Sequence, residues 1–162
     1  MNITAEKIIY QNEQIRHKIR RIAFQIYENN VDETSVILAG IAKNGFTLAE
    51  RLKIELEKIS NIEVVLCKVS MDKKNPLDGE IKTSLNTDDY QGKSIVLVDD
   101  VLNSGTTLIY GVRHFLSVPL KRFKTAVLVD RNHKKYPVKA DFKGISLSTS
   151  LNEMVKVRFS AE

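Results

Sequence analysis

The chain has 162 residues, enough for one domain with a sizeable core and too few for two. Hydrophobic residues make up 43% of it, which excludes wholesale disorder, and no apolar run approaches the roughly 20 residues that a membrane span needs. The net charge of +5 fits anionic ligands such as diphosphates or RNA, although solvated lysine-rich surfaces are the commoner cause of such an excess.

Targeting and redox signals are sparse. The N-terminus lacks the basic-then-apolar order of a signal peptide, and Cys67 is the sole cysteine, so no intramolecular disulfide is possible. Cys67 lies in the alternating run 64–69, which favours packing in the core or at an edge over nucleophilic chemistry. We therefore expect a cytoplasmic protein without a membrane partner.

Residues 4–29 carry apolar side chains at roughly helical spacing, which predicts one or two helices. Basic side chains are interleaved with them and form a basic face: Arg16, His17, Lys18, Arg20 and Arg21. A solvated surface is the default explanation for such a face, and His17 is expected to be exposed and without a role.

Residues 35–40 form an apolar run that predicts a buried strand, followed by a helix that runs to about Ile59. Between them lies the turn Ala42, Lys43, Asn44 and Gly45. Its amide groups and the Lys43 ammonium could meet an anion at the helix start. An ordinary strand-to-helix turn is the alternative.

Residues 62–70 alternate between apolar and polar and predict another strand. The next segment, 71–79, is rich in Asp, Lys, Asn, Pro and Gly and cannot build a core. We expect a mobile loop or a hairpin tip there.

Residues 94–98 are continuously apolar and rich in β-branched side chains, which predicts a strand buried on both faces at the centre of a parallel sheet. Asp99 and Asp100 follow, at the edge where open α/β sheets bind ligands. The next residues are small and rich in hydroxyls: Asn103, Ser104, Gly105, Thr106 and Thr107. Apolar residues at helical spacing from 108 to 116 then predict a helix that starts just after this turn.

A helix start preceded by small residues is a seat for a phosphate, whereas adjacent carboxylates would repel one. The combination fits a ligand that offers an anion to the turn and hydroxyls or a cation to the acids, as a sugar phosphate with bound Mg²⁺ would. The alternative is that the acids are ordinary strand-end residues and that Ser104 or Thr106 only caps a helix.

Two rival phosphate motifs fail. Gly92-Lys93-Ser94 mimics the end of a Walker A loop, but Thr87 stands at the required upstream glycine and the triplet precedes a strand instead of following one. No Gly-x-Gly-x-x-Gly occurs in the sequence. The nucleoside-triphosphatase and dinucleotide-binding interpretations are therefore excluded.

Residues 122–129 predict a further buried strand, which would bring Asp130, Arg131 and His133 to the same edge as the two acids. Residues 154–159 alternate and predict a last strand. The whole pattern predicts an α/β fold for residues 1–162 as a single domain, with a central, mostly parallel twisted sheet flanked by helices.

The segment Val96-Leu-Val-Asp-Asp-Val-Leu-Asn-Ser-Gly-Thr-Thr107 resembles the phosphoribosyl-diphosphate signature of the type I phosphoribosyltransferases. The resemblance implies a fold with a small hood and a flexible lid over residues 71–80, which here is short. It implies that Asp99 and Asp100 hold the ribose hydroxyls, that residues 103–107 bind the 5′-phosphate and that residues 42–45 bind the diphosphate. Mg²⁺ would be held by the donor and water near the two acids, not directly by the protein.

Residues Val127–His133, Pro137–Gly144 and Ser148–Ser150 resemble the bacterial pyrimidine-operon attenuation regulators that also act as uracil phosphoribosyltransferases. This likeness covers most of the chain outside residues 71–90. It implies transfer of ribose 5-phosphate to a uracil-type nucleobase with release of diphosphate, in a homodimer or larger homo-oligomer. Asp130, Arg131 and His133, with the backbone of residues 148–152, would face the nucleobase.

Two alternatives stay open. The chain could be an RNA-binding regulator, with contacts from Arg20, Arg21, Arg131, His133, Lys139 and Lys143, although Phe24 stands where those regulators often have histidine. It could also bind the sugar donor with little turnover, since Asn44 replaces an arginine found in other members. A purine substrate is less expected, because several purine-specific relatives carry at the position of Asn103 an Asp that acts as a base near the purine, and an amide cannot accept that proton.

Overall fold

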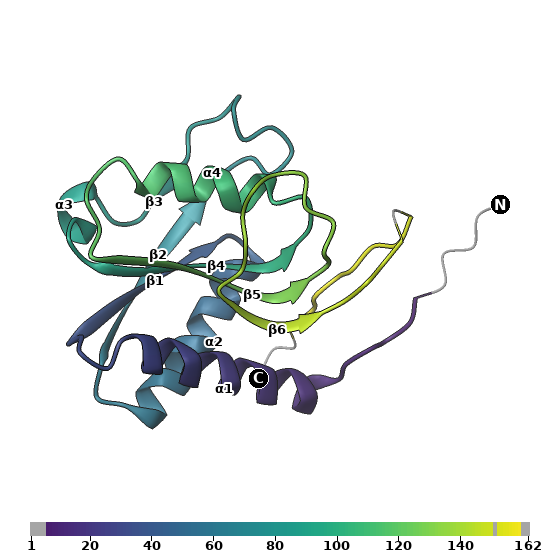
Figure 1. The fold of residues 1–162 in the computed structure, drawn as a ribbon, viewed down its shortest axis with the longest axis horizontal. Coiled ribbons are helices and arrows are strands. Elements are labelled where there is room, and N and C mark those ends of the chain that lie inside the picture. Colours follow the sequence, from purple (N-terminus) through teal and green to yellow (C-terminus); the bar gives the residue numbers. More distant parts are fainter. Residues whose placement is uncertain (1–5, 151, 160–162) are drawn as a thin grey trace.

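The computed structural model describes residues 6–150 and 152–159 and is built around a six-stranded sheet of order β3-β2-β1-β4-β5-β6 (Figure 1). The strands are β1 (Ser35–Ile41), β2 (Glu63–Ser70), β3 (Lys82–Thr83), β4 (Ser94–Leu102), β5 (Arg122–Asp130) and β6 (Phe142–Ser146). Neighbouring strands are parallel except for β2 and β3, which are antiparallel. The predicted mostly parallel α/β fold is confirmed.

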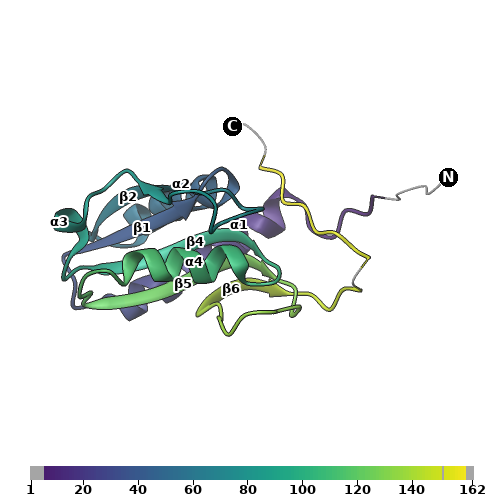
Figure 2. The same ribbon diagram turned by 90° about the horizontal axis from the view of Figure 1, so that it is seen from above.

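Helices cover both faces of this sheet (Figures 1 and 2). Helices α1 (Asn12–Asn29) and α2 (Asn44–Ile59) pack on one face, and α4 (Thr106–Phe115) packs on the other, while α3 (Thr87–Tyr90) is a single turn before β4. Successive side chains of β4 alternate between the two cores, so that Val96 joins α1 and α2 whereas Leu97 joins α4. Burial on both faces explains the continuous apolar run of β4.

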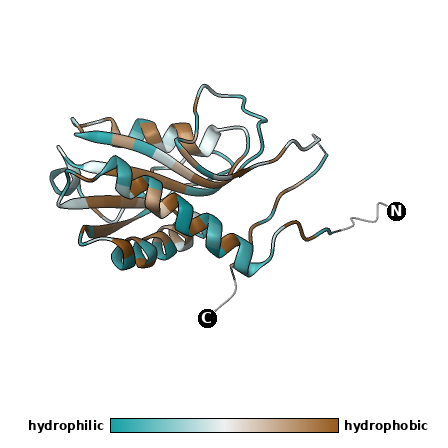
Figure 3. Cartoon of the chain, turned by 60° about the horizontal axis from the view of Figure 1, so that its bottom comes forward, coloured by the Kyte–Doolittle hydropathy of each residue, from teal (hydrophilic) through white to brown (hydrophobic). Residues whose placement is uncertain are grey.

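Helix α1 is a single helix whose apolar stripe, including Ile19, Ile22 and Ile26, is buried, while the basic residues Arg16, Arg20 and Arg21 are exposed. Figure 3 shows hydrophilic and hydrophobic segments alternating along this helix. It begins at Asn12, later than the predicted start, and residues 6–11 precede it without helix or strand. The first residues of the predicted segment, 4 and 5, lie outside the described residues. His17 is exposed, as expected.

Strand β4 is longer than the sequence predicts. Pairing of Asp99 with Val127, of Val101 with Val129 and of Leu102 with Asp130 carries the ladder beyond both acids. The acids therefore lie within the last part of the strand instead of following it. This placement fixes their backbone by the sheet, which a loop would not do.

The predicted strand at 154–159 is not a strand. Val155, Val157 and Phe159 are partly buried against the α1 and α2 core, whereas Lys156 and Arg158 are exposed, so the alternation is real. The segment packs against the core on the α1 and α2 side, however, and is no member of the sheet. We call residues 152–159 the C-terminal strap.

The described part of the chain also contains three short elements that the sequence did not predict: strands β3 and β6 and the turn α3. Residues 71–81 connect β2 and β3, which pair as a hairpin, so the hairpin expectation for this segment is confirmed. Cys67 is buried in β2, where burial raises its pKa, in keeping with a packing role. Within the described residues, no helix has the length and apolarity to cross a bilayer.

Candidate functional site

Two strand-to-helix turns meet at the carboxyl edge of the sheet. Strands β1 and β4 are direct neighbours, with Gly40 opposite Val98, so the turn of residues 42–45 lies beside the end of β4. We call it the first turn, and residues 103–107 the second turn. Each leads into a helix N-terminus, of α2 and α4 respectively, where backbone N–H groups lack intrahelical partners and the dipole is positive. Two helix ends with positive dipoles thus lie at one edge of the sheet.

Two glycines permit this close arrangement. A Cβ on Gly45 would lie 2.7 Å from the Val98 carbonyl oxygen and 3.0 Å from the Asp99 Cα, so only glycine lets the first turn press against β4 at the acids. Gly105 has a φ of 89°, in the left-handed region, and a Cβ there would lie 2.6 Å from Val138 Cγ1. The second turn therefore needs glycine for its conformation and for its packing.

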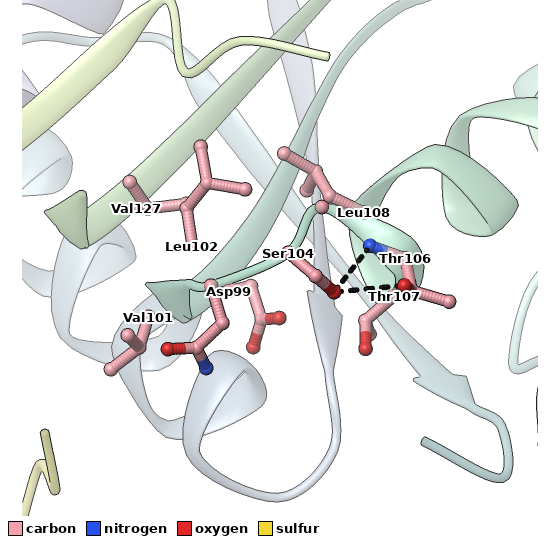
Figure 4. A pocket seen from close by; sticks show the side chains of 10 residues that line it. Asp99, Val101, Leu102, Ser104, Thr106, Thr107, Leu108 and Val127 are labelled. Atoms are coloured by element: carbon pink, nitrogen blue, oxygen red, sulfur yellow. Dashed lines mark hydrogen bonds between the residues drawn. The ribbon is translucent and has the colours of Figure 1, made fainter. Parts of the chain in front are cut away.

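The second turn is braced from within and from outside. Ser104 Oγ lies 2.8 Å from Thr106 Oγ1, and the Thr106 amide donates to Ser104 Oγ at 3.3 Å (Figure 4). The backbone amides of Lys135 and Tyr136 donate to the Ser104 carbonyl oxygen at 2.7 and 3.1 Å. Together with Asp99, Val101, Leu102 and Val127, the turn and the start of α4 line a small pocket. The result is a preformed cup of hydroxyl and amide groups beside one carboxylate.

Asp99 lines this pocket from β4 and is only 4% exposed. Its Oδ1 accepts a hydrogen bond from the Asp100 amide at 2.9 Å and lies 3.3 Å from Lys73 Nζ. Burial raises the pKa of Asp99 to about 7, while the Lys73 ammonium opposes the rise and the Asp100 carboxylate adds to it. The group can thus gain or lose a proton near neutral pH.

Asp100 has different neighbours and is only partly buried. Its Oδ1 accepts from the Val101 amide at 2.9 Å, and its Oδ2 accepts from Asn44 Nδ2 at 3.1 Å. The same Asn44 amide donates to the Val157 carbonyl oxygen at 2.9 Å. Asn44 therefore ties the first turn, the second acid and the C-terminal strap together.

The residues predicted for the nucleobase side divide into two groups. Arg131 donates from Nη1 to Asn103 Oδ1 and from Nε to Thr149 Oγ1, both at 3.0 Å, and His133 contacts the Thr149 carbonyl oxygen. These two side chains thus lie at the edge between the second turn and residues 149–153; Leu151 lies outside the described residues. Asp130 is buried, accepts from the Asn132 amide and lies 3.7 Å from Lys143 Nζ, which joins β5 to β6.

The candidate RNA contacts on α1, β6 and the segment before β6 have different neighbours. Arg21 donates to the carbonyl oxygens of Lys143 and Gly144, which fastens α1 to β6. The Arg20 guanidinium lies 5.7 Å from the centre of the exposed Phe24 ring. Lys139 is exposed and lies 3.6 Å from Asp141. Arg21 and Lys143 thus lie where α1 and β6 meet, while Arg20 contacts Phe24 of its own helix.

Sequence reasoning missed Lys73 and the strap as parts of this site. Lys73 sits in a segment with no periodicity, so nothing in the pattern predicts that its ammonium reaches Asp99 across the carboxyl edge. The contact of Asn44 with Val157 joins residues that are 113 positions apart. The only available signal for the strap was its alternation, which also fits a strand.

The site suits a magnesium ion held mainly by a ligand. Within residues 6–150 and 152–159, no group of three His, Cys, Asp or Glu side chains could hold a metal by itself. Two carboxylates beside hydroxyl and amide oxygens form a hard oxygen set, which Mg²⁺ prefers, and Mg²⁺ usually keeps several waters and binds through one or two carboxylates plus phosphates. The residues present therefore fit an ion shared with a phosphorylated ligand.

Comparison with known proteins agrees with this geometry. The family model described as "Phosphoribosyl transferase domain" matches residues 6–159. Among solved structures, the hypoxanthine phosphoribosyltransferase of Trypanosoma cruzi is 22% identical, with a TM-score of 0.75 over 88% of this chain and 82% of that one. A hypoxanthine-guanine phosphoribosyltransferase from Bacillus anthracis is also 22% identical, with a TM-score of 0.72 over 90% and 84%. At this identity the two structures show a shared fold.

Curated relatives are closer in sequence. The "Bifunctional protein PyrR" of Haemophilus ducreyi is 33% identical over 94% of this chain and 89% of the relative, and that of Fusobacterium nucleatum is 36% identical over 93% and 89%. These relatives confirm the resemblance to the pyrimidine-operon regulators with uracil phosphoribosyltransferase activity. The chain belongs to the phosphoribosyl transferase domain family.

Proposed function

We propose that the protein transfers ribose 5-phosphate from phosphoribosyl diphosphate to a nitrogen of a uracil-type nucleobase and releases diphosphate. The observation that carries this proposal is the meeting of two helix N-termini with two adjacent carboxylates at one edge of the sheet. A donor with a phosphate at one end, a diphosphate at the other and hydroxyls between them matches that order of groups. Family membership and the uracil-type relatives support the same reaction.

In this proposal the two turns hold the two anionic ends of the donor. The second turn, residues 103–107, receives the 5′-phosphate on its amides and on the hydroxyls of Ser104, Thr106 and Thr107. The first turn, Ala42 to Gly45, receives the diphosphate on its amides and on the Lys43 ammonium. Since both turns are fixed by glycine contacts, the donor would be oriented without rearrangement of the sheet.

The acids act between the two turns. Asp99 and Asp100 accept hydrogen bonds from the ribose hydroxyls and stabilise the positive charge that develops on the sugar as the bond to diphosphate breaks. Because Lys73 occupies Asp99 Oδ1, its ammonium has to leave that oxygen for a ribose hydroxyl or a cation. A bound Mg²⁺ would supply charge neutralisation of the diphosphate, near these two carboxylates.

A turnover assay tests the proposal. Protein, phosphoribosyl diphosphate and Mg²⁺ are incubated with a panel of free bases, and nucleotide formation is followed for each. We expect uridine monophosphate from uracil and little product from purines. Donor binding without nucleotide from any base would contradict the enzyme and leave a donor-binding protein.

We propose RNA binding as a second function, supported by the cationic and aromatic groups where α1 meets β6. Arg20 and Phe24 are exposed together, which suits phosphate contact and base stacking, and Lys143 stands on the adjacent strand. Lys139 extends the positive surface, while Arg131 and His133 lie nearer the base side. Binding of a pyrimidine-operon leader RNA should weaken steeply with salt. Absent or salt-insensitive binding would remove this function.

We further propose that residues 1–162 act as one catalytic domain, in the cytoplasm, within a homodimer or larger homo-oligomer. Exposed apolar side chains near the ends of the described chain, Ile8, Ile9 and Met154, support self-association. Glu6 and Arg158 form an ion pair at 3.1 Å, which brings these two segments together. Light scattering coupled to size-exclusion chromatography tests the assembly, and a monomer at assay concentration would contradict it.

A further inference from the structure

Lys73 reaches a buried acid of the site from outside the sheet. Its ammonium lies 3.3 Å from Asp99 Oδ1, although its side chain is 39% exposed and Asp99 is only 4% exposed. In the sheet, β1 lies between β2, which leads to Lys73, and β4, which carries Asp99. The connection between β2 and β3 therefore extends past the end of β1 to make this contact.

The β2–β3 connection, residues 71–81, is shaped so that it presents this lysine. Its two ends are anchored, because Met71 and Ile81 are partly buried against the core on the α4 side of the sheet. Asp72 Oδ1 accepts hydrogen bonds from the backbone amides of Lys74, at 2.9 Å, and Asn75, at 3.3 Å. An aspartate that bonds the amides two and three residues ahead closes a turn. The lysine that follows the aspartate is thus held at the start of that turn.

The contact with Asp99 is nevertheless easy to break. Between its anchored ends the connection is exposed, apart from the partly buried Pro76, and Leu77 is 70% exposed. A segment with few buried apolar contacts opens at low cost in free energy. Solvent also screens the ion pair, because the Lys73 side chain is partly exposed. The ammonium is therefore a removable partner of the acid and not a permanent block.

The cost of displacing the ammonium depends on what the ligand brings. A sugar hydroxyl that donates to Asp99 replaces a charged donor by a neutral one, so the buried carboxylate loses its positive partner. A ligand that carries a divalent cation returns positive charge to the vicinity of this carboxylate. The ion pair should therefore hinder a metal-free sugar phosphate more than a metal-loaded donor.

We propose that Lys73 is an internal competitor for Asp99: it holds the ligand-free site in a self-inhibited state and makes the site favour a donor with a bound cation over a metal-free sugar phosphate. Asp72 is the positioning residue that presents the lysine. Apparent affinity is lowered, because only molecules in which Lys73 has left Asp99 bind the sugar. The inference rests on the proposed function and adds a regulation of the same site.

Ribose 5-phosphate without metal is the sharpest probe, because it offers hydroxyls to Asp99 but carries no diphosphate that a lysine could bind. Calorimetry with the full chain in EDTA at pH 8.5, above the Asp99 pKa of about 7, keeps the carboxylate ionised. We expect Lys73→Met to bind this probe about fivefold more tightly than wild type, the upper end for an ion pair with an exposed partner. Lys74→Met is the matched control: it removes the same charge from the neighbouring residue and should not tighten binding.

Two results with this probe would overturn the inference. One is an unchanged affinity in Lys73→Met, and the other is weaker binding, which would mean that the lysine assists the ligand instead of competing with it. If wild type binds neither ribose 5-phosphate nor the donor with Mg²⁺, the proposed function itself fails. If wild type binds the donor and Lys73→Met gains nothing toward ribose 5-phosphate, only this inference fails.

Phosphoribosyl diphosphate with Mg²⁺ tests the selectivity in the same assay without EDTA. Since this ligand brings its own cation, Lys73→Met should gain no more than about twofold in affinity for it. The preference for the metal-loaded donor over ribose 5-phosphate should therefore fall by about twofold or more in this variant. An equal gain for both ligands would overturn the role of Lys73 in selectivity.

Asp72→Ala and Asp72→Asn test the positioning role, because both remove the charge but only the asparagine keeps an oxygen that closes the turn. Asp72→Ala should tighten the binding of ribose 5-phosphate by about twofold, since the lysine then lies at Asp99 less often. Asp72→Asn should resemble wild type. Equal effects of the two substitutions, or no effect of Asp72→Ala, would overturn the assignment of Asp72.

Discussion

Asp99 and Asp100 are neighbours in sequence, yet they belong to different surroundings. Asp99 lies on the α4 side, in the pocket of the second turn, nearly without solvent and beside Lys73. Asp100 lies on the other side, partly buried, and is bound by Asn44 and through it to the C-terminal strap. Because side chains of a strand alternate between its faces, two consecutive acids meet two different sets of neighbours. The pair is therefore two carboxylates in two environments, not one duplicated group.

The largest expected effect separates the two acids by turnover. Asp99→Asn removes the buried carboxylate that the proposed function places next to the sugar, and it should lower kcat/KM by about a hundredfold, in the range found when one electrostatic group of an active site is removed. Asp100→Asn removes the charge of a more exposed carboxylate and should cost about tenfold. Equal losses, or a greater loss from Asp100→Asn, would contradict the unequal roles. Steady-state kinetics with varied donor provides the measurement.

The next comparison uses stability against pH. The pKa of Asp99 rises from 3.8 to about 7 in the folded chain, so between these values the folded state holds a proton that the unfolded state has released. The free energy of unfolding should therefore fall as pH rises through this window, by at most about 4 kcal/mol for a shift of that size. Asp99→Asn removes this contribution. Its stability relative to wild type should grow from pH 5 to pH 8 in urea unfolding, and a constant difference would contradict the buried acid.

A smaller effect concerns Lys73, whose ammonium lies 3.3 Å from Asp99 Oδ1. Lys73→Met should raise the pKa of Asp99 further, because the ammonium lowers it. Since the Lys73 side chain is 39% exposed, solvent screens the pair, and the acid limb of the pH–rate profile should move upward by less than about one pH unit. Lys74→Met, at the exposed neighbour, is the control. A profile that stays in place, or moves to lower pH, would show that the contact does not tune Asp99.

The smallest effect is expected at Asn44, whose amide donates a hydrogen bond to Asp100. Asn44→Ala removes hydrogen bonds to Asp100 and to the strap, at a cost of about 1 kcal/mol. Tryptic cleavage after Lys156 and Arg158 should become faster, and the KM for the donor should rise a few-fold. The control is Asn75→Ala in the β2–β3 connection. Unchanged cleavage would mean that Asn44 does not hold the strap.

Regular parts of the molecule could be predicted from sequence because their pattern and their structure have the same cause. Burial on both faces makes the middle of each central strand apolar, at residues 36–39 of β1, 95–98 of β4 and 126–129 of β5. The small residues before the apolar stripe of α4 predict the second turn. The motif at 96–107 then supplied the family. The end of β4 was misplaced, because acids near a strand end do not reveal how far its ladder with β5 continues.

Irregular parts could not be predicted, since long-range contacts determine them. The contact of Lys73 with Asp99 and the hydrogen bonds of Arg131 to Thr149, Ser150 and Glu153 have no periodic signal. The alternation of the strap does not reveal that it packs against the core without joining the sheet. Asp130, Arg131 and His133 are predicted to face the nucleobase, and sequence did not reveal that Asp130 lies 3.7 Å from Lys143 Nζ of β6. Sequence alone therefore predicts which residues lie at the carboxyl edge of the sheet. It does not predict which of these residues form hydrogen bonds or ion pairs with one another.

The most direct test of the central claim is a calorimetric titration of phosphoribosyl diphosphate into the protein in the presence of Mg²⁺. Wild type should bind the donor, and the double variant Asp99→Asn with Asp100→Asn should lose at least about a hundredfold in affinity, because both carboxylates are removed while both turns remain. A double variant that binds the donor as tightly as wild type would contradict the account.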